Sequence, residues 1–136
     1  MELFLKFLPV IIVVLAIFAA REGYSIFKYT RQSRLHEAAR SGRMDMVRKY
    51  LQTGHTVNAR DPRFGLTPLH YAVRNGHVEI AKLLIRGGAD LDDLSVHGIT
   101  AGQWAAEYLS AADLEELRRL SARFRQEHQA QDLYSR

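Results

Sequence analysis

The 136-residue sequence contains no cysteine, three prolines and one tryptophan. Without cysteine the chain has no disulfide, no thiolate metal ligand and no cysteine nucleophile, although this absence is compatible with either redox environment. The net charge of +4 comes from 19 basic and 15 acidic residues, and 47% of the residues are hydrophobic. This ordinary composition disfavours extensive disorder. The length favours one domain and leaves little room for a multi-site enzyme.

Patterns for phosphate, metal and nucleic-acid binding are also lacking. The pair Gly87-Gly88 follows a helical pattern instead of preceding one, so it does not resemble a phosphate-binding loop. The acidic cluster at residues 90–93, with His97, matches no metal-loop spacing. The basic excess is modest, and no basic helix carries base-reading side chains. We therefore expect no catalytic residue, no metal, no cofactor, no small-molecule substrate and no nucleic acid.

One long hydrophobic run is present near the start of the sequence. Residues 3–20 are apolar except for Lys6, and a helix of that length measures about 27 Å, just enough to cross a bilayer. Lys6 lies near the end of the run, where its side chain can reach the interface. We expect residues 1–21 to form a transmembrane anchor.

A cleaved secretory signal is the alternative, because residues 7–20 also have the length of a signal core. Cleavage requires small residues at the −1 and −3 positions. Cleavage after Ala20 would place Phe18 at −3, and cleavage after Ala19 would place Ile17 there. The context favours an uncleaved anchor and leaves a periplasmic or secreted protein as the alternative.

Positive charge predicts the orientation of the anchor. Residues 21–34 contain four basic residues, whereas only Lys6 and the α-amino group lie on the other side. Because positively charged flanks stay in the cytoplasm, we expect a single-pass protein whose remaining chain is cytoplasmic, after a juxtamembrane linker at residues 22–32.

Three copies of one pattern follow. The clearest copy reads Gly65-Leu66-Thr67-Pro68-Leu69-His70-Tyr71-Ala72 and continues to Gly87-Gly88-Ala89-Asp90. A shift of 34 residues places Leu35-His36 on Leu69-His70, and a shift of 33 places Gly98-Ile99-Thr100-Ala101 on residues 65–68. This period indicates stacked helix pairs, since one pair cannot bury its apolar face alone.

Each copy predicts its own helix boundaries. Thr67 is expected to cap the first helix, with Pro68 at the first helical position. Gly76 is expected to end this helix in a left-handed conformation. Lys82 is expected to face solvent. The apolar positions predicted to form the buried faces are Leu69, Ala72, Val73, Val78, Ile80, Leu83 and Leu84.

The run Thr67-Pro68-Leu69-His70-Tyr71-Ala72, followed by Gly87-Gly88-Ala89-Asp90, resembles the ankyrin repeat. The resemblance implies an all-α solenoid of helix-turn-helix pairs. His36 and His70 occupy the leucine–histidine position of the repeat, where we expect structural hydrogen bonds rather than catalysis. The predicted organisation is a repeat array at 33–122, in copies 33–61, 62–94 and 95–122, then a C-terminal helical extension or tail at 123–136.

The outer copies depart from this pattern. Ser33 and Arg34 replace threonine and proline in the first copy, and one residue is inserted within 61–64, which predicts a longer turn. The third copy lacks the glycine and histidine that separate the two helices. Its second helix is expected to begin with Asp113 as N-cap and to continue as a C-terminal cap, with fraying from Gln126 onward.

A binding surface remains as the expected functional feature. In such arrays the first helices and the projecting turns line a concave face. Arginine and an exposed aromatic ring there resemble the composition of interaction hot spots, and they favour an acidic protein partner. The side chains that the core does not require, with Val96 and Ile99 beside them, are Arg40, Arg60, Arg63, Phe64, Leu66, Arg74, Asn75, His97, Glu107 and Tyr108.

The sequence therefore predicts a membrane-anchored adaptor, not an enzyme, that holds a partner protein through its concave face and turns. A soluble secreted or periplasmic binder is one alternative. A small accessory subunit of a membrane complex, in which the anchor itself makes the main contacts, is another.

Overall fold

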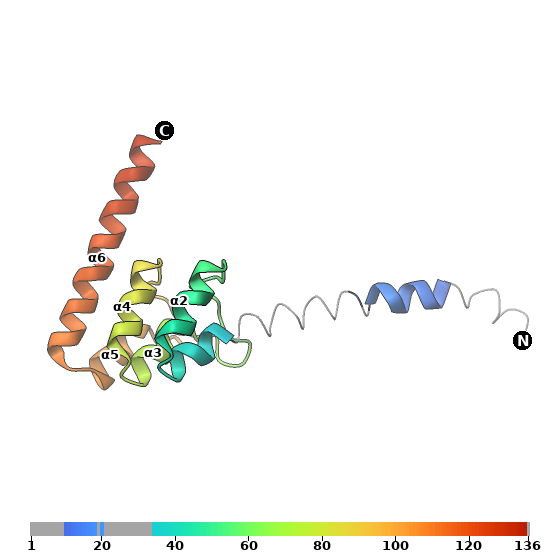
Figure 1. Cartoon of the computed structure of the whole chain (residues 1–136), viewed down its shortest axis with the longest axis horizontal. Helices are drawn as coiled ribbons and strands as arrows, with labels where there is room; N and C mark the ends of the chain where they lie inside the picture. The colour runs from blue at the N-terminus through green and yellow to red at the C-terminus, as the bar shows by residue number, and fades with distance from the viewer. Residues whose placement is uncertain (1–9, 19, 21–33, 136) are drawn as a thin grey trace, which may run out of the picture. The chain divides into compact units, whose positions relative to one another are not determined.

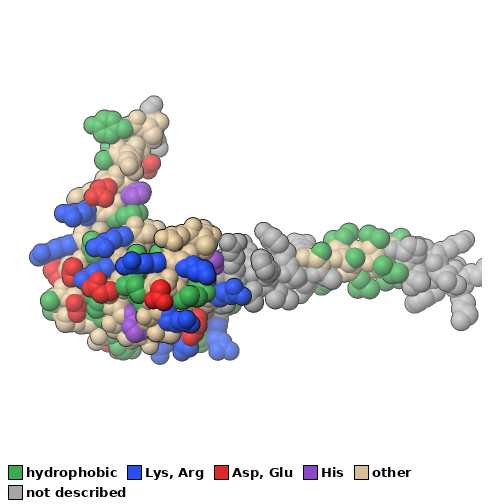
Figure 2. All heavy atoms as spheres, viewed as in Figure 1, with side chains coloured by type: hydrophobic (Ala, Val, Ile, Leu, Met, Phe, Trp, Pro, Cys, Tyr) green, Lys and Arg blue, Asp and Glu red, His purple; other side chains and the backbone are tan. Residues whose placement is uncertain are grey.

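The computed structural model describes residues 10–18, 20 and 34–135, in two units that span residues 1–31 and 32–136. In the first unit residues 10–18 are helical, and apolar side chains cover the visible face of this helix in Figure 2. None of the helices in the described ranges combines the length and apolar character needed to cross a bilayer. The expected anchor also includes residues 1–9 and 19, and those residues and the linker at 22–32 lie outside the described ranges.

The second unit is an array of short helices (Figure 1). Residues 34–40 are helical, and α3 packs against both α4 and α5, while α4 packs against α2 and α6. Within residues 34–135 the sole β pairing is an isolated bridge between Leu94 and Thr100. This architecture confirms the all-α part of the predicted fold class for residues 34–135. The named helices are α2 (Met44–Gln52), α3 (Pro68–Arg74), α4 (Val78–Arg86), α5 (Ala101–Tyr108) and α6 (Ala111–Tyr134).

The boundaries of α3 confirm the prediction. Thr67 is the N-cap in an extended conformation, and Pro68 occupies the first helical position. The His70 ring completes the cap, because its Nδ1 accepts the Thr67 backbone N–H at 3.2 Å. After the C-cap Asn75, Gly76 has φ +73°, a left-handed conformation that glycine adopts without a Cβ clash.

The core runs along the facing sides of these helices. Leu69, Ala72 and Leu84 are fully buried, as predicted. Leu83 is only partly buried at the edge of the core, because the buried stripe of α4 follows Ile80, Ala81, Leu84 and Ile85. The prediction that Leu83 belongs to the buried face of this helix is therefore wrong.

Lys82 also differs from the prediction. Its side chain is only 13% exposed, and Nζ contacts Glu79 Oε1 at 2.8 Å and Glu116 Oε2 at 2.9 Å. The lysine thus connects α4 to α6 instead of pointing freely into solvent.

The last helix begins earlier than predicted and stays helical through most of the predicted C-terminal extension. Ser110, not Asp113, is the N-cap, and its Oγ accepts the Asp113 backbone N–H at 3.1 Å. Asp113 instead lies in the first turn, where a carboxylate favours the positive end of the helix dipole. The helix continues to Tyr134 and projects beyond the other helices (Figure 1), leaving Leu133 79% and Tyr134 94% exposed.

Candidate functional site

The lengthened turn at residues 61–66, here called the first finger, is organised by one carboxylate. Asp61 Oδ1 accepts the backbone N–H groups of Arg63 at 2.8 Å and Phe64 at 2.6 Å. Oδ2 accepts the Leu66 N–H at 3.1 Å and the Tyr71 hydroxyl at 3.1 Å. Burial acts to raise the pKa of Asp61, but these hydrogen bonds outweigh it and lower that pKa. The turn that contains the inserted residue therefore has a fixed conformation.

A second finger, residues 94–100, lies against the first. The Val96 backbone N–H donates to the Phe64 carbonyl at 3.2 Å, and the Ser95 N–H donates to Ile99 O at 2.9 Å. Gly65, between these contacts, has φ +61°, and a Cβ added to it would lie 2.7 Å from Val96 Cγ1. Only glycine fits this position without movement of the neighbouring finger.

Two histidines hold the fingers to the first helices. His36 Nε2 donates to the carbonyls of Ala59 at 2.7 Å and Leu66 at 3.0 Å. His70 Nε2 donates to the Ile99 carbonyl at 3.2 Å, while its Nδ1 is occupied by the α3 cap. Burial lowers the pKa of His70, which disfavours the charged form of the ring. The predicted structural role of both histidines is confirmed.

A cleft of about 220 Å³ opens between the fingers and helices α3 and α5. This volume is below the range of roughly 300–1,000 Å³ typical of small-molecule sites, and it suits a single side chain. We call this feature the finger cleft. Its lining residues are Phe64, Leu66, Arg74, Ser95, His97, Ile99 and Trp104.

Aromatic rings line the cleft, and two guanidinium groups lie beside them. The Trp104 ring is edge-on to His70 at 5.5 Å and to Tyr108 at 6.4 Å between centroids. The Arg74 guanidinium carbon lies 5.6 Å from the Trp104 centroid, and that of Arg63 lies 5.8 Å from the Phe64 centroid. These are cation–π distances, so both arginines are positioned beside apolar surface with their charge still accessible.

The structure brings together four of the predicted surface residues, because Phe64, Leu66, Arg74 and His97 all line the finger cleft. Leu66 was expected to be dispensable for the core, but it is only 4% exposed. Its backbone N–H closes the Asp61 turn, and its buried side chain contributes to the lining of the cleft.

The other predicted residues lie outside the cleft. Arg60 donates to the Leu94 carbonyl and pairs with Asp93 at 3.6 Å, so it links the two fingers. Arg40 pairs with Glu37 at 2.9 Å, and Asn75 donates to the Tyr71 carbonyl at the end of α3. Arg63 and Tyr108 adjoin the lining rings, and Glu107 is exposed on α5. Binding by any of the ten remains a prediction.

Two residues important for the cleft were missed by the sequence analysis. Trp104 is the sole tryptophan of the chain and falls 33 positions after Tyr71, and both facts could have marked it. Asp61 was seen only as part of an insertion. Its role depends on four donors that converge in space, which no spacing rule reveals.

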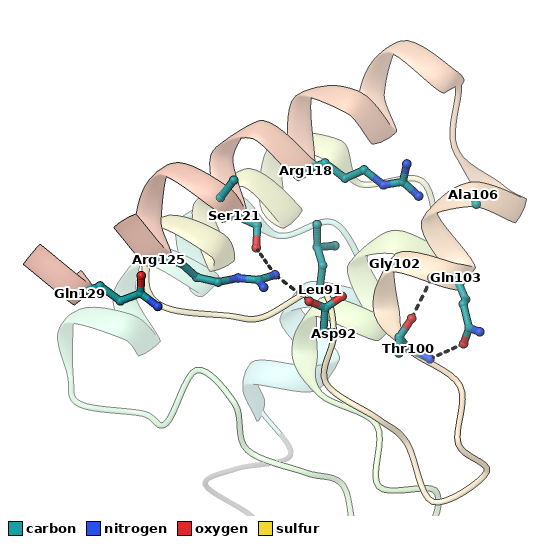
Figure 3. A pocket seen from close by; sticks show the side chains of 11 residues that line it. Leu91, Asp92, Thr100, Gly102, Gln103, Ala106, Arg118, Ser121, Arg125 and Gln129 are labelled. Atoms are coloured by element: carbon teal, nitrogen blue, oxygen red, sulfur yellow. Dashed lines mark hydrogen bonds and ion pairs between the residues drawn. The ribbon is translucent and has the colours of Figure 1, made fainter. Parts of the chain in front are cut away.

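A larger hollow of about 620 Å³ lies between α5 and α6 (Figure 3). Its polar groups mostly satisfy one another. The Thr100 N–H donates to Gln103 Oε1 at 2.8 Å, and Arg125 Nη2 contacts Asp92 Oδ2 at 2.7 Å and Ser121 Oγ at 3.3 Å. Within the described ranges no three His, Asp or Glu side chains could hold a metal ion. The hollow is a mixed polar and apolar surface between α5, α6 and the turn at Leu91-Asp92.

The comparisons with known proteins agree with this architecture. Residues 35–85 match the family model for ankyrin repeats (many copies). Acyl-CoA-binding domain-containing protein 2 of Arabidopsis thaliana is 45% identical over 56 residues, which are 41% of this chain and 16% of that protein. Palmitoyltransferase Hip14 of Drosophila melanogaster is also 45% identical over 56 residues, 41% of this chain and 9% of that protein. Ankyrin repeat domain-containing protein 40 of Homo sapiens is 35% identical over 68 residues, 50% of this chain and 18% of that protein.

Proposed function

We propose that this chain, an ankyrin-repeat protein, binds a partner protein through its two fingers and the inner helices α3 and α5. The observation that carries this proposal is the finger cleft, where Trp104 and Phe64 lie beside Arg74 and Arg63. Tryptophan and arginine are the residues most enriched at the energetic centres of protein interfaces. The chain spans less than a fifth of each relative described above, so the activities in their names are not transferred to it.

The chain is further proposed to be a single-pass membrane adaptor with cytoplasmic repeats. The apolar run at residues 3–20 and the four basic residues at 21–34 support this location. The helical residues 10–18 expose large apolar side chains, which is the property that a bilayer would cover.

Quantitative capture of the partner from detergent extracts tests the binding role. Phe64→Ala combined with Arg63→Ala is expected to weaken capture by about 2 kcal/mol or more, because both side chains project from the first finger. Leu133→Ala combined with Arg123→Ala is the matched control, since it removes the same side-chain classes from exposed positions on α6. Equal capture by the finger variant and the wild type would refute this role. If an unrelated anchor then abolished capture, residues 3–20 would be the recognition element of an accessory subunit.

Carbonate extraction and protease protection test the location. The proposal expects the intact chain to stay in washed membranes and the repeats to resist protease added from outside. A mature N-terminus at Ala20 or Arg21 in a soluble fraction would instead establish the released, secreted form.

A further inference from the structure

We propose that the finger cleft takes one apolar side chain from an acidic peptide segment, whose carboxylates are held by Arg63 and Arg74. This inference rests on the proposed protein-binding function and specifies the chemistry of the partner. It follows from the size of the cleft, from its lining and from the arginines that remain available at its rim.

The interior of the cleft fits an apolar group. Phe64, Leu66, Ile99 and Trp104 contribute rings and branched aliphatic side chains to a space of about 220 Å³. Among its polar lining residues, Ser95 is already engaged, because Ser95 Oγ accepts the backbone N–H groups of His97 and Ile99 at 3.3 Å. A polar side chain entering the cleft would therefore lose its water among mostly apolar lining groups, with His97 and Arg74 as the remaining polar side chains of the lining.

The charge at the rim favours acidic residues beside that apolar group. The Asp61 carboxylate accepts three backbone N–H groups of the first finger and the Tyr71 hydroxyl of α3, so its oxygens are engaged by these neutral donors and not by the Arg63 guanidinium. Arg60 is bound to Asp93 and Leu94. Among residues 34–135, Arg63 and Arg74 have no acidic partner, and each guanidinium lies over a ring. A stacked guanidinium can still donate two parallel hydrogen bonds to a carboxylate.

The acidic side chain Glu107 restricts where the carboxylates of the segment can bind on this surface. It is exposed on α5, one turn after Trp104, and would repel a carboxylate there. The acidic residues of the segment are therefore expected on the side of the first finger and α3, where Arg63 and Arg74 lie.

A nucleic acid also combines negative charge with groups that stack on aromatic rings, but the chain fits it less well. Nucleic-acid affinity grows with the number of phosphate contacts. Basic and acidic side chains are interspersed on the visible face of the repeat unit in Figure 2, without a continuous basic track. Two arginines flanking one apolar cleft match a short peptide better than a phosphate backbone.

Trp104 provides a direct readout, because it is the sole tryptophan of the chain and lines the cleft. The full chain in detergent micelles would be titrated with a short synthetic peptide that carries one leucine between aspartate and glutamate residues. Matched peptides replace the leucine by serine, or replace the acidic residues by lysine. We expect saturable change in Trp104 emission with the first peptide and at least about tenfold weaker binding of each matched peptide.

Two variants test which arginine contacts the acidic peptide. Arg74→Gln is expected to weaken the acidic peptide about tenfold and to reduce the difference between acidic and lysine peptides. Arg86→Gln, which removes an exposed arginine from the last turn of α4, is the control and should leave the affinity unchanged. Equal melting temperatures of the three proteins would show that the fold is retained.

Several outcomes would overturn the inference. Equal binding of the three peptides, or tighter binding of single-stranded RNA than of the acidic peptide, would do so. If Trp104 emission changed with protein concentration and Leu133→Ser abolished that change, the occupant of the cleft would be a second copy of the chain. That copy would bind through its exposed residues Asp132-Leu133-Tyr134. If the captured partner depended on Phe64 while acidic peptides did not bind, this inference would fail and the proposed function would stand. If capture did not depend on the fingers, the proposed function itself would fail.

Discussion

The second and third repeats start in the same way but differ in what they connect. In each, the residue three positions after the capping threonine accepts that threonine's backbone N–H, through His70 Nδ1 at 3.2 Å and through Gln103 Oε1 at 2.8 Å. His70 also has a second ring nitrogen, Nε2, which donates to the Ile99 carbonyl in the following repeat. Gln103 has no second side-chain nitrogen. The two side chains therefore share the capping role, and the histidine adds the link that an internal repeat requires.

The second helices of these repeats differ as well. Helix α4 packs against α2 on one side and α6 on the other, whereas α6 packs against α4 and α5 and borders the open hollow. His77, the N-cap of α4, also donates from Nε2 to the Arg40 carbonyl of the first repeat at 3.1 Å. In contrast, α6 is capped locally by Ser110. The second repeat is thus bound on both sides, whereas the third packs on the second through α5 and α6 and borders the open hollow on its other side.

The largest expected effect compares two core leucines related by the 33-residue period. Leu84 and Leu117 are both fully buried, and leucine-to-alanine changes in cores cost about 2–5 kcal/mol. We expect Leu84→Ala near the upper end of this range, because two neighbouring helices enclose the cavity. Leu117→Ala should fall nearer the lower end, since α6 can shift toward the hollow. Urea denaturation of both variants measures the difference, and equal losses would mean that the third repeat is as firmly enclosed as the second.

The next largest effect on stability is expected when the glutamine that caps the third repeat replaces the histidine at the same position of the second repeat. His70→Gln is expected to retain a cap like that of Gln103 but to remove the bond from His70 to the Ile99 carbonyl, which keeps the Ser95 N–H as donor, a loss of about 0.5–1.5 kcal/mol. Gln103→His is the reciprocal variant, which keeps a cap and finds no following repeat to contact. A comparable loss of unfolding free energy in both variants would contradict the separate linking role of His70.

The dependence of stability on pH provides a finer test of the same link. Burial lowers the pKa of His70 below its ordinary value of 6.5, with Asp93 and Asp61 acting to raise it and Arg60 acting to lower it. The unfolded chain therefore binds a proton first as the pH falls below 6.5, and stability is lost from there down to the folded-state pKa. Asp61 acts separately. Its pKa is lowered from the ordinary value of 3.8, so its contribution to stability is lost only below pH 3.8.

Denaturation curves between about pH 8 and pH 5 measure how the unfolding free energy changes with pH, and His70→Gln should reduce that change. The same change in the variant would assign the pH dependence to another histidine.

The sequence predicted the features that depend on a few neighbouring residues. The start of α3 at Thr67-Pro68, its end at Gly76 and the roles of His36 and His70 were all correct, because caps, left-handed glycines and repeat spacing act within one repeat or its period. The all-helical array followed from the same repeating pattern.

The errors involve residues whose environment is set by another element. Lys82 was placed in solvent because the sequence of α4 does not show that Glu116 of α6 lies beside it. Leu66 belongs to the finger but is buried by the turn that Asp61 closes. The N-cap of α6 was missed since Ser110 and Asp113 are both good capping residues, and only the backbone conformation at Ser110 decides between them.

The smallest expected effect concerns the end of the array. Arg125 contacts Asp90 at 3.2 Å and Asp92 at 2.7 Å, but its side chain is 49% exposed, and exposed ion pairs contribute about 0–1 kcal/mol. We expect Arg125→Gln to lower the unfolding free energy by no more than about 1 kcal/mol, and added salt to reduce the difference from wild type. Arg86→Gln is the control for removing an exposed arginine without these contacts. A salt-independent loss of about 2 kcal/mol or more would show that this terminal contact holds α6 to the turn at least as firmly as the histidine link joins the second repeat to the third.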